Sequence, residues 1–183
     1  MFIQTEPTPN PSTLKFLPGR PVMGQGTADF PTAEKAHQSP LADRLFQVDG
    51  VRSVFLGSDF VSVTKADGRE WREIKPMVLG AMVEHFVSGQ PTVLDGTHAD
   101  GGGGGGDDEV VAKIKSLLDT RIRPAVAQDG GDIVFREFRD GIVYLRMQGA
   151  CSGCPSSTAT LKNGIENMMR HFVPEVRGVR AVD

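Results

Sequence analysis

The sequence has few cysteines, no long apolar stretch and no marked excess of either charge, and each shortage excludes a class of protein. A small secreted scaffold carries several disulfide pairs, whereas this chain of 183 residues has 2 cysteines. Its formal net charge of −3 provides no basic field to hold nucleic acid or an acidic membrane surface. No apolar stretch approaches the roughly 20 residues that a membrane-spanning helix needs. We therefore expect neither nucleic acid nor a membrane as a partner.

The beginning of the sequence shows no targeting signal. Residues 1–6 form neither a basic segment before an apolar stretch nor an Arg-rich amphipathic presequence. We therefore expect a native start and a cytoplasmic protein of the bacterial kind. A mature form in the mitochondrial matrix would have the same features and stays open.

A run of glycines divides the chain. Residues 101–106 are all glycine and the acidic residues 107–109 follow them, so this stretch is expected to be a flexible coil. A phosphate-binding loop would need Gly-Lys-Ser/Thr at a helix start, and acidic residues would repel phosphate. We predict an N-terminal domain over residues 1–92, a Gly-rich linker over 93–108 and a C-terminal domain over 109–183.

The N-terminal domain has the patterns of a small α+β unit. β-branched and aromatic runs predict strands, and apolar residues at helical spacing predict helices. The predicted strands cover residues 2–5, 13–17, 51–56 and 60–64, and the predicted helices begin after Ser39 and at Trp71, the second ending at Gly89. No cluster of ligands stands out in this domain, so we expect surface or packing roles for His37 and His85.

The C-terminal domain is predicted to have the order helix–strand–strand–helix–strand, which suits a small sheet with both helices on one face. Asp140-Gly141 predicts a tight hairpin turn between the first two strands. The predicted elements are a helix over 110–122 that Pro124 ends or kinks, strands over 133–138 and 142–147, a helix from Pro155 and a strand over 176–182. The whole chain is therefore expected to be two small α/β-sandwich-like domains of the α+β class.

The two cysteines, Cys151 and Cys154, have the spacing of a metal-binding or redox pair. Gly149 and Gly153 permit backbone turns that a β carbon would obstruct. Pro155 is expected to begin a helix, whose N-terminus favours thiolate over thiol. A disulfide between these cysteines would close a very short loop and stabilise little, so a purely structural bridge is not expected.

One chain supplies too few ligands for a complete metal centre. Structural zinc and most iron–sulfur clusters use four ligands, whereas the pair offers two thiolates. His171 is a poor completion, because at about 1.5 Å per residue its helix would carry it more than roughly 20 Å from the loop. A two-fold dimer brings the same loop together twice and would supply four thiolates around one bridging centre.

Other interpretations of the pair stay open at this point. A thiol–disulfide oxidoreductase also carries Cys-X-X-Cys at a strand-to-helix turn, but that fold places the motif early, and 29 residues follow Cys154 here. A dimeric zinc module fits the ligands, although the predicted core gives no evident need for a metal. Two partly buried thiols without a role are the third alternative, which the surrounding glycines and helix start disfavour.

Two sets of residues resemble a known family. The C-terminal set resembles the NifU C-terminal domain, and it comprises residues 129–132 (Asp-Gly-Gly-Asp) and 149–158, which contain both cysteines. The N-terminal set resembles the Nfu N-terminal domain, and it comprises residues 5–11, 39–42, 50–51, 54–55, 59–63 and 85–86. The resemblance covers nearly the whole chain except the linker.

The resemblance implies an iron–sulfur cluster carrier rather than an enzyme. In this family a [4Fe–4S] cluster is bound between two protomers by the paired cysteines and is passed to apo-proteins, which implies Cys151 and Cys154 as the ligands here. The implied partners are a second copy of the chain, an upstream iron–sulfur scaffold and apo client proteins. The desulfurase-docking and ferredoxin-like domains of larger NifU proteins are not recognisable, so the resemblance implies a late-acting carrier.

Overall fold

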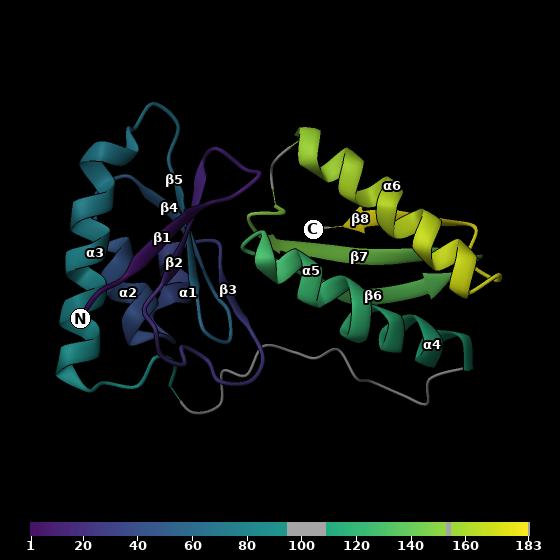
Figure 1. The fold of residues 1–183 in the computed structure, drawn as a ribbon, viewed down its shortest axis with the longest axis horizontal. Helices are drawn as coiled ribbons and strands as arrows, with labels where there is room; N and C mark the ends of the chain where they lie inside the picture. Colours follow the sequence, from purple (N-terminus) through teal and green to yellow (C-terminus); the bar gives the residue numbers. More distant parts are fainter. Residues whose placement is uncertain (95–108, 153–154, 183) are drawn as a thin grey trace. The chain divides into compact units, whose positions relative to one another are not determined.

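The computed structural model describes residues 1–94, 109–152 and 155–182, with the backbone alone for 155–160, and it divides into two compact units (Figure 1). The units are Met1–Ala99 and Asp100–Asp183, and each combines helices with a sheet. The predicted α+β class with two domains is confirmed. Residues 95–108 lie outside the described part, so the bounds of the linker stay a prediction.

The first unit contains a five-stranded antiparallel sheet. Its strand order is β1-β2-β5-β4-β3. The strands are β1 (Gln4–Pro7), β2 (Thr13–Leu17), β3 (Ala28–Phe30), β4 (Val51–Leu56) and β5 (Val61–Lys65). The β-branched and aromatic runs therefore predicted β2, β4 and β5 to within one residue and placed β1 two residues too early, whereas the short β3 was missed.

Three helices complete this unit: α1 (Ala33–Ala36), α2 (Pro40–Phe46) and α3 (Trp71–Ser88). The predicted cap is present, since the Ser39 hydroxyl accepts a hydrogen bond from the Ala42 N–H at 3.0 Å. Gly89 ends α3 in the left-handed conformation, with φ of 71°. The helices and the sheet enclose a core of large apolar side chains, among them Phe16, Leu41, Leu45, Ile74 and Met82.

His37 and His85, the two histidines among the described residues of this unit, have the surface and packing roles expected of them. His37 is exposed, and its Nδ1 lies 2.9 Å from Asp43 Oδ1. His85 is buried in α3, where neither ring nitrogen has a hydrogen-bond partner among the described residues. Burial lowers the pKa of His85 below its ordinary value, and the nearby Arg44 charge lowers it further.

The second unit contains a three-stranded sheet of order β6-β7-β8. β6 (Gly131–Arg139) pairs antiparallel with β7 (Ile142–Gly149), and β7 pairs parallel with β8 (Gly178–Val182). The predicted hairpin turn is confirmed, because Asp140 and Gly141 have φ of 54° and 77°, as a primed two-residue turn requires.

The first helical segment of this unit passes over Pro124 instead of ending there. α4 (Glu109–Leu117) continues into a π-helical turn, η1 (Leu118–Ile122), and then into α5 (Arg123–Gln128). The Arg123 N–H donates to the Leu118 carbonyl, five residues back, and Pro124 then occupies the first turn of α5. In the first turn of a helix the backbone N–H groups lack intrahelical partners in any case, so a proline there costs no hydrogen bond. The wider π-helical turn before it therefore lets the helical segment continue past Pro124.

Both helical segments cover the same face of the sheet, as predicted. α6 (Pro155–Phe172) forms the crossover that the parallel β7–β8 pair requires. Side chains from the segments α4–α5 and α6 join those of the three strands in one buried cluster, which includes Ile114, Leu118, Ile122, Ile133, Val143, Leu145, Ile165, Met169 and Val179. Among the described helices, none is long and apolar enough to cross a bilayer.

Candidate functional site

The structure places one of the two predicted ligands inside the second unit. Cys151 lies two residues after the end of β7 and is 6% exposed, and it belongs to the same apolar cluster as Ile133 and Leu145. Cys154 lies outside the described residues. The Cys151 thiol is therefore a packed group of the core, a feature that the sequence pattern alone did not indicate.

Gly131 leaves the space that the Cys151 side chain occupies. A β carbon built on Gly131 would lie 2.6 Å from Cys151 Sγ and 2.8 Å from the Gln148 carbonyl oxygen. Carbon atoms do not approach other heavy atoms this closely without displacing them. The backbone of Gly131 is outside the left-handed region, so this position needs glycine for its small size.

Backbone hydrogen bonds join the turn before β6 to the loop that carries Cys151. Gly130 has φ of 80° and ends α5, its N–H donating to the Ala127 carbonyl at 3.0 Å. The Gly130 carbonyl in turn accepts from the Ala150 N–H at 3.2 Å. In the loop, the Ser152 N–H donates to the Gly149 carbonyl at 3.1 Å. The motif Asp-Gly-Gly-Asp thus lies directly against the cysteine loop.

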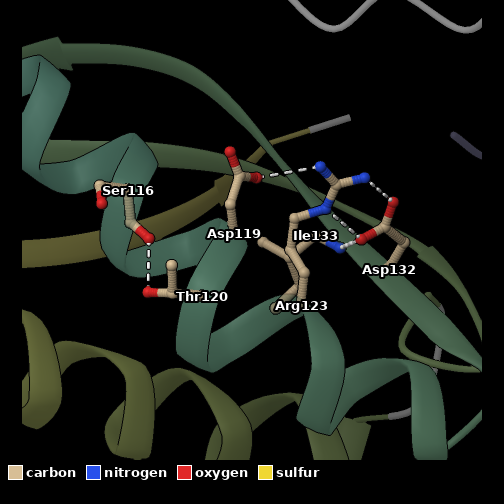
Figure 2. Close-up of polar contacts among 6 residues, drawn as sticks. All are labelled: Ser116, Asp119, Thr120, Arg123, Asp132 and Ile133. Carbon is tan, nitrogen blue, oxygen red and sulfur yellow. Dashed lines mark hydrogen bonds and ion pairs between the residues drawn. The ribbon is translucent and has the colours of Figure 1, made fainter.

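Asp132, the last residue of that motif, is buried in an ion pair with Arg123 (Figure 2). Arg123 donates from Nε to Asp132 Oδ1 at 2.9 Å and from Nη2 to Asp132 Oδ2 at 2.8 Å. The Ile133 N–H also donates to Oδ1, at 2.8 Å, and Arg123 Nη1 donates to Asp119 Oδ1 at 3.0 Å. The hydrogen bonds to Asp132 raise the pKa of Arg123, more than its partial burial lowers it.

Gln148 adds a second buried polar group beside the loop. It pairs with Asp132 across the β6–β7 ladder and is 6% exposed. Its Oε1 atom has no hydrogen-bond partner among the described residues. Leaving such an oxygen unsatisfied costs about 1–3 kcal/mol of folding free energy. An apolar side chain at this position would not carry that cost.

The described side chains offer sulfur as the only soft ligand at this corner. Asp132 is engaged by Arg123, and His171 is exposed at the far end of α6. Within residues 1–94, 109–152 and 161–182, no three His, Cys, Asp or Glu side chains gather as a metal site would require. Thiolate is the ligand that iron–sulfur clusters and zinc prefer, so Cys151 fits either centre as one contributor.

Sequence reasoning anticipated the cysteine pair but missed the residues that support it. Gly131 and Asp132 were singled out as part of the motif that resembles the family. Arg123 gave no signal, because an ion pair between a residue of a helix and the start of the next strand has no fixed sequence spacing. Gln148 was expected to lie just after the strand over 142–147, and nothing in the pattern marked its side chain as buried.

The chain matches known families over both units. Residues 3–89 match the family described as "Scaffold protein Nfu/NifU N terminal", and residues 114–180 match the family described as "NifU-like domain". The human protein named "NFU1 iron-sulfur cluster scaffold homolog, mitochondrial" is 53% identical over 183 residues, a match that covers 100% of this chain and 72% of the relative.

The chain belongs to the Nfu family. A Nfu relative of Drosophila ananassae with the same name as the human one is 55% identical and aligns with 100% of this chain and 64% of its own length. The Arabidopsis thaliana protein named "NifU-like protein 4, mitochondrial" is 56% identical over 98% of this chain and 65% of its own length. The chain thus spans between 64% and 72% of the length of these three Nfu relatives.

The names of these Nfu relatives correct one prediction. All three are named mitochondrial, which points to mitochondria and makes the expectation of a bacterial cytoplasmic protein wrong. Among solved structures, a NifU-like protein from Saccharomyces cerevisiae has a TM-score of 0.46 and 25% identity, covering 52% of this chain and 86% of that one.

Proposed function

We propose that this chain is a late-acting carrier of iron–sulfur clusters, which two copies hold jointly and pass to apo-proteins. Its cargo is one [4Fe–4S] cluster per dimer, with Cys151 and Cys154 of each copy as ligands. The observation that carries the proposal is that the chain's 2 cysteines form one Cys-X-X-Cys loop within the part that matches the NifU-like domain. The human and Drosophila relatives are named iron-sulfur cluster scaffold homologs, which supports this class of cargo.

The joint binding follows from the shortage of ligands. A cubane cluster is most often held by four cysteines, and one chain provides two. Two copies related by a two-fold axis bring identical loops together and complete the set. α6 begins at Pro155, immediately after the loop, so its unpaired N–H groups and its dipole favour the negative charge of the thiolates.

Release follows from the same arrangement. Each copy contributes half of the ligands, so the thiolates of an acceptor replace one Cys-X-X-Cys pair and then the other. The chain acts by binding and exchange rather than by catalysis, and the relative affinities of carrier and acceptor set the direction of transfer. Its partners are an upstream scaffold, a second copy of the chain and apo client proteins. The compartment is the mitochondrial matrix, by analogy with the relatives named mitochondrial.

The burial of Cys151 weighs against the competing oxidoreductase function. A thiol–disulfide oxidoreductase attacks its substrate with an accessible thiolate, whereas Cys151 is 6% exposed. A zinc module is separated from a cluster carrier by metal content, since zinc sites are colourless and contain no inorganic sulfide. A further test of the zinc module is chelation, which should unfold or dissociate it.

The decisive experiment is anaerobic reconstitution of the full chain with iron and sulfide. We expect about four iron and four sulfide per dimer, with broad visible absorption. Cys151→Ala and Cys154→Ala should each abolish loading, whereas Ser152→Ala, which changes an exposed side chain of the same loop, should load normally. One zinc per dimer without sulfide would overturn the cluster. A loaded single copy with a complete ligand set would overturn the joint site.

The first unit has no proposed part in holding the cluster, so its role is sought in transfer to clients. Deleting residues 1–95 should leave iron and sulfide loading intact and change the rate or range of transfer to apo-acceptors. An unchanged rate with every acceptor tested would leave client recognition without support.

A further inference from the structure

We infer that Gly131 and the Arg123–Asp132 ion pair are positioning residues, which set where the Cys151 thiol lies. The inference rests on the proposed function in one respect, the identification of Cys151 as a cluster ligand. Its physical content, the placement of one sulfur atom by three other residues, is independent of any cluster and is measurable on the chain alone.

Gly131 is the surface against which the thiol rests. The 2.6 Å between Cys151 Sγ and a β carbon built on Gly131 means that the sulfur occupies the volume of the missing side chain. The same β carbon would lie 3.1 Å from the Cys151 backbone nitrogen. Any movement of the Gly131 backbone toward or away from the loop therefore displaces or releases the sulfur.

Asp132 prevents such movement, because it is the next residue and is held at three points. Two are the parallel hydrogen bonds from Arg123, and the third is the Ile133 N–H (Figure 2). A bidentate guanidinium–carboxylate pair fixes both distance and plane, unlike the single contact that a lysine would make. The Asp132 side chain is 4% exposed, so water does not compete for it.

Arg123 is itself fixed by the helix that carries it. It follows the π-helical turn η1 directly, and its Nη1 atom is also bound by Asp119. The pair therefore anchors the start of β6 to the end of the helical segment. In the β6–β7 ladder, Asp132 is paired with Gln148 and Gly131 with Gly149. The ion pair therefore also restrains β7, the strand that leads into Cys151.

Another ion pair on β6 provides a contrast and a matched control. Arg139 Nη1 lies 3.9 Å from Glu137 Oε1 at the other end of the strand, and the two side chains are 62% and 53% exposed. Such exposed pairs contribute little because water screens them. Removing this pair changes the charge of the same strand without touching the position of Gly131.

The test is the rate at which the Cys151 thiol of the reduced, metal-free full chain is alkylated by iodoacetamide. Fragment-ion mass spectrometry reads Cys151 separately from Cys154. We expect alkylation to be about tenfold faster in Gly131→Ala, where the added methyl group expels the sulfur, and several-fold faster in Asp132→Asn and Arg123→Lys. Glu137→Gln and Gly164→Ala, which is exposed and has open space around its β position, should leave the rate unchanged.

A purely structural role would give a different pattern. The substitution Ile114→Val shortens a fully buried side chain of α4, and it measures what general destabilisation does to the thiol. Denaturant unfolding of every variant gives the fraction unfolded. Alkylation that rises only in proportion to that fraction, or equally in Ile114→Val, would overturn the inference. Asp132→Asn and Arg123→Lys keep the test informative if Gly131→Ala does not fold.

The outcomes separate this inference from the proposed function. Variants with normal alkylation rates in a chain that loads its cluster would refute the positioning role and leave the carrier function standing. Faster alkylation in the variants of a chain that never binds iron and sulfide would support the positioning role and refute the carrier function.

Discussion

The two units of the chain are stabilised in different ways. The first unit has a large apolar core that also buries His85, and its ion pairs lie at the surface, such as Arg69–Asp49, whose side chains are 45% and 78% exposed. The second unit instead places a buried carboxylate, an unsatisfied amide oxygen and a cysteine around one turn. Polar burial costs stability in both units, and what distinguishes the second unit is that its buried polar groups gather at one turn beside Cys151, which supports the proposed role of that cysteine.

The largest expected effect tests whether the two cores are independent. Leu145→Ala in the second unit should cost that unit about 2–5 kcal/mol, enough to unfold much of it and abolish cluster loading. Trp71, the only tryptophan, lies in the first unit and should keep its unfolding transition. Met82→Ala should do the reverse, shifting the Trp71 transition and leaving loading intact. Joint loss of both signals in either variant would show that the units unfold together.

The next effect compares a buried with an exposed ion pair. Arg123→Met leaves the buried Asp132 carboxylate without its partner, and we expect a loss of about 1–3 kcal/mol. This is less than a fully enclosed pair would lose, because the Arg123 side chain is 36% exposed. Arg69→Met should cost about 0–1 kcal/mol. Denaturant unfolding, followed by far-ultraviolet circular dichroism, measures both, and equal losses would contradict the contrast between the units.

The third effect is a dependence of stability on pH. It is expected in the first unit rather than the second, because the buried histidine His85 lies there. The pKa of His85 is lowered from 6.5, so the folded state keeps the ring neutral where the unfolded chain binds a proton. Stability of the first unit should therefore be full above pH 6.5 and fall as the pH drops below it, by at most about 1.4 kcal/mol per pH unit. The Trp71 transition measures this fall. His85→Phe should flatten the dependence, and an unchanged slope would assign it to other groups.

The smallest effect is shared by the units. Gly80 in α3 and Gly164 in α6 lie inside helices, and a β carbon on either would meet no atom within 4 Å. Gly80→Ala and Gly164→Ala should each stabilise their own unit by about 0.5–1 kcal/mol, since alanine restricts the unfolded chain and favours the helix. A loss of stability at either position, in denaturant unfolding, would mean that the glycine has a packing role.

Features that depend on neighbouring residues were predicted more accurately than features that depend on longer-range packing. The Ser39 cap and the Asp140-Gly141 turn were predictable because each depends on neighbouring residues. β3 and α1 were missed because elements of three or four residues show no clear periodicity. Pro124 was expected to end or kink its helix, and the π-helical turn that accommodates it was not foreseen because its wider hydrogen bonding leaves no mark in the pattern of apolar residues.

The candidate site was predictable only in part. The cysteine spacing indicated a shared metal centre, and the ligand assignment of Cys151 and Cys154 stays a prediction. The burial of Cys151 and the ion pair between Arg123 and Asp132 were not predictable. Both depend on which helix covers which end of the sheet, and that is settled by the packing of the whole domain.

The amino-acid sequence by itself determined the two-domain α+β organisation and the number of thiolates that each copy can offer. Periodicity, turn chemistry and residue counts are local quantities, so they can be evaluated without coordinates. Only the tertiary structure decided that Gly131 lies beneath the Cys151 sulfur and that Arg123 holds the adjoining carboxylate. Those contacts join residues on different elements, and they arise from strand register and helix packing, which no local pattern specifies.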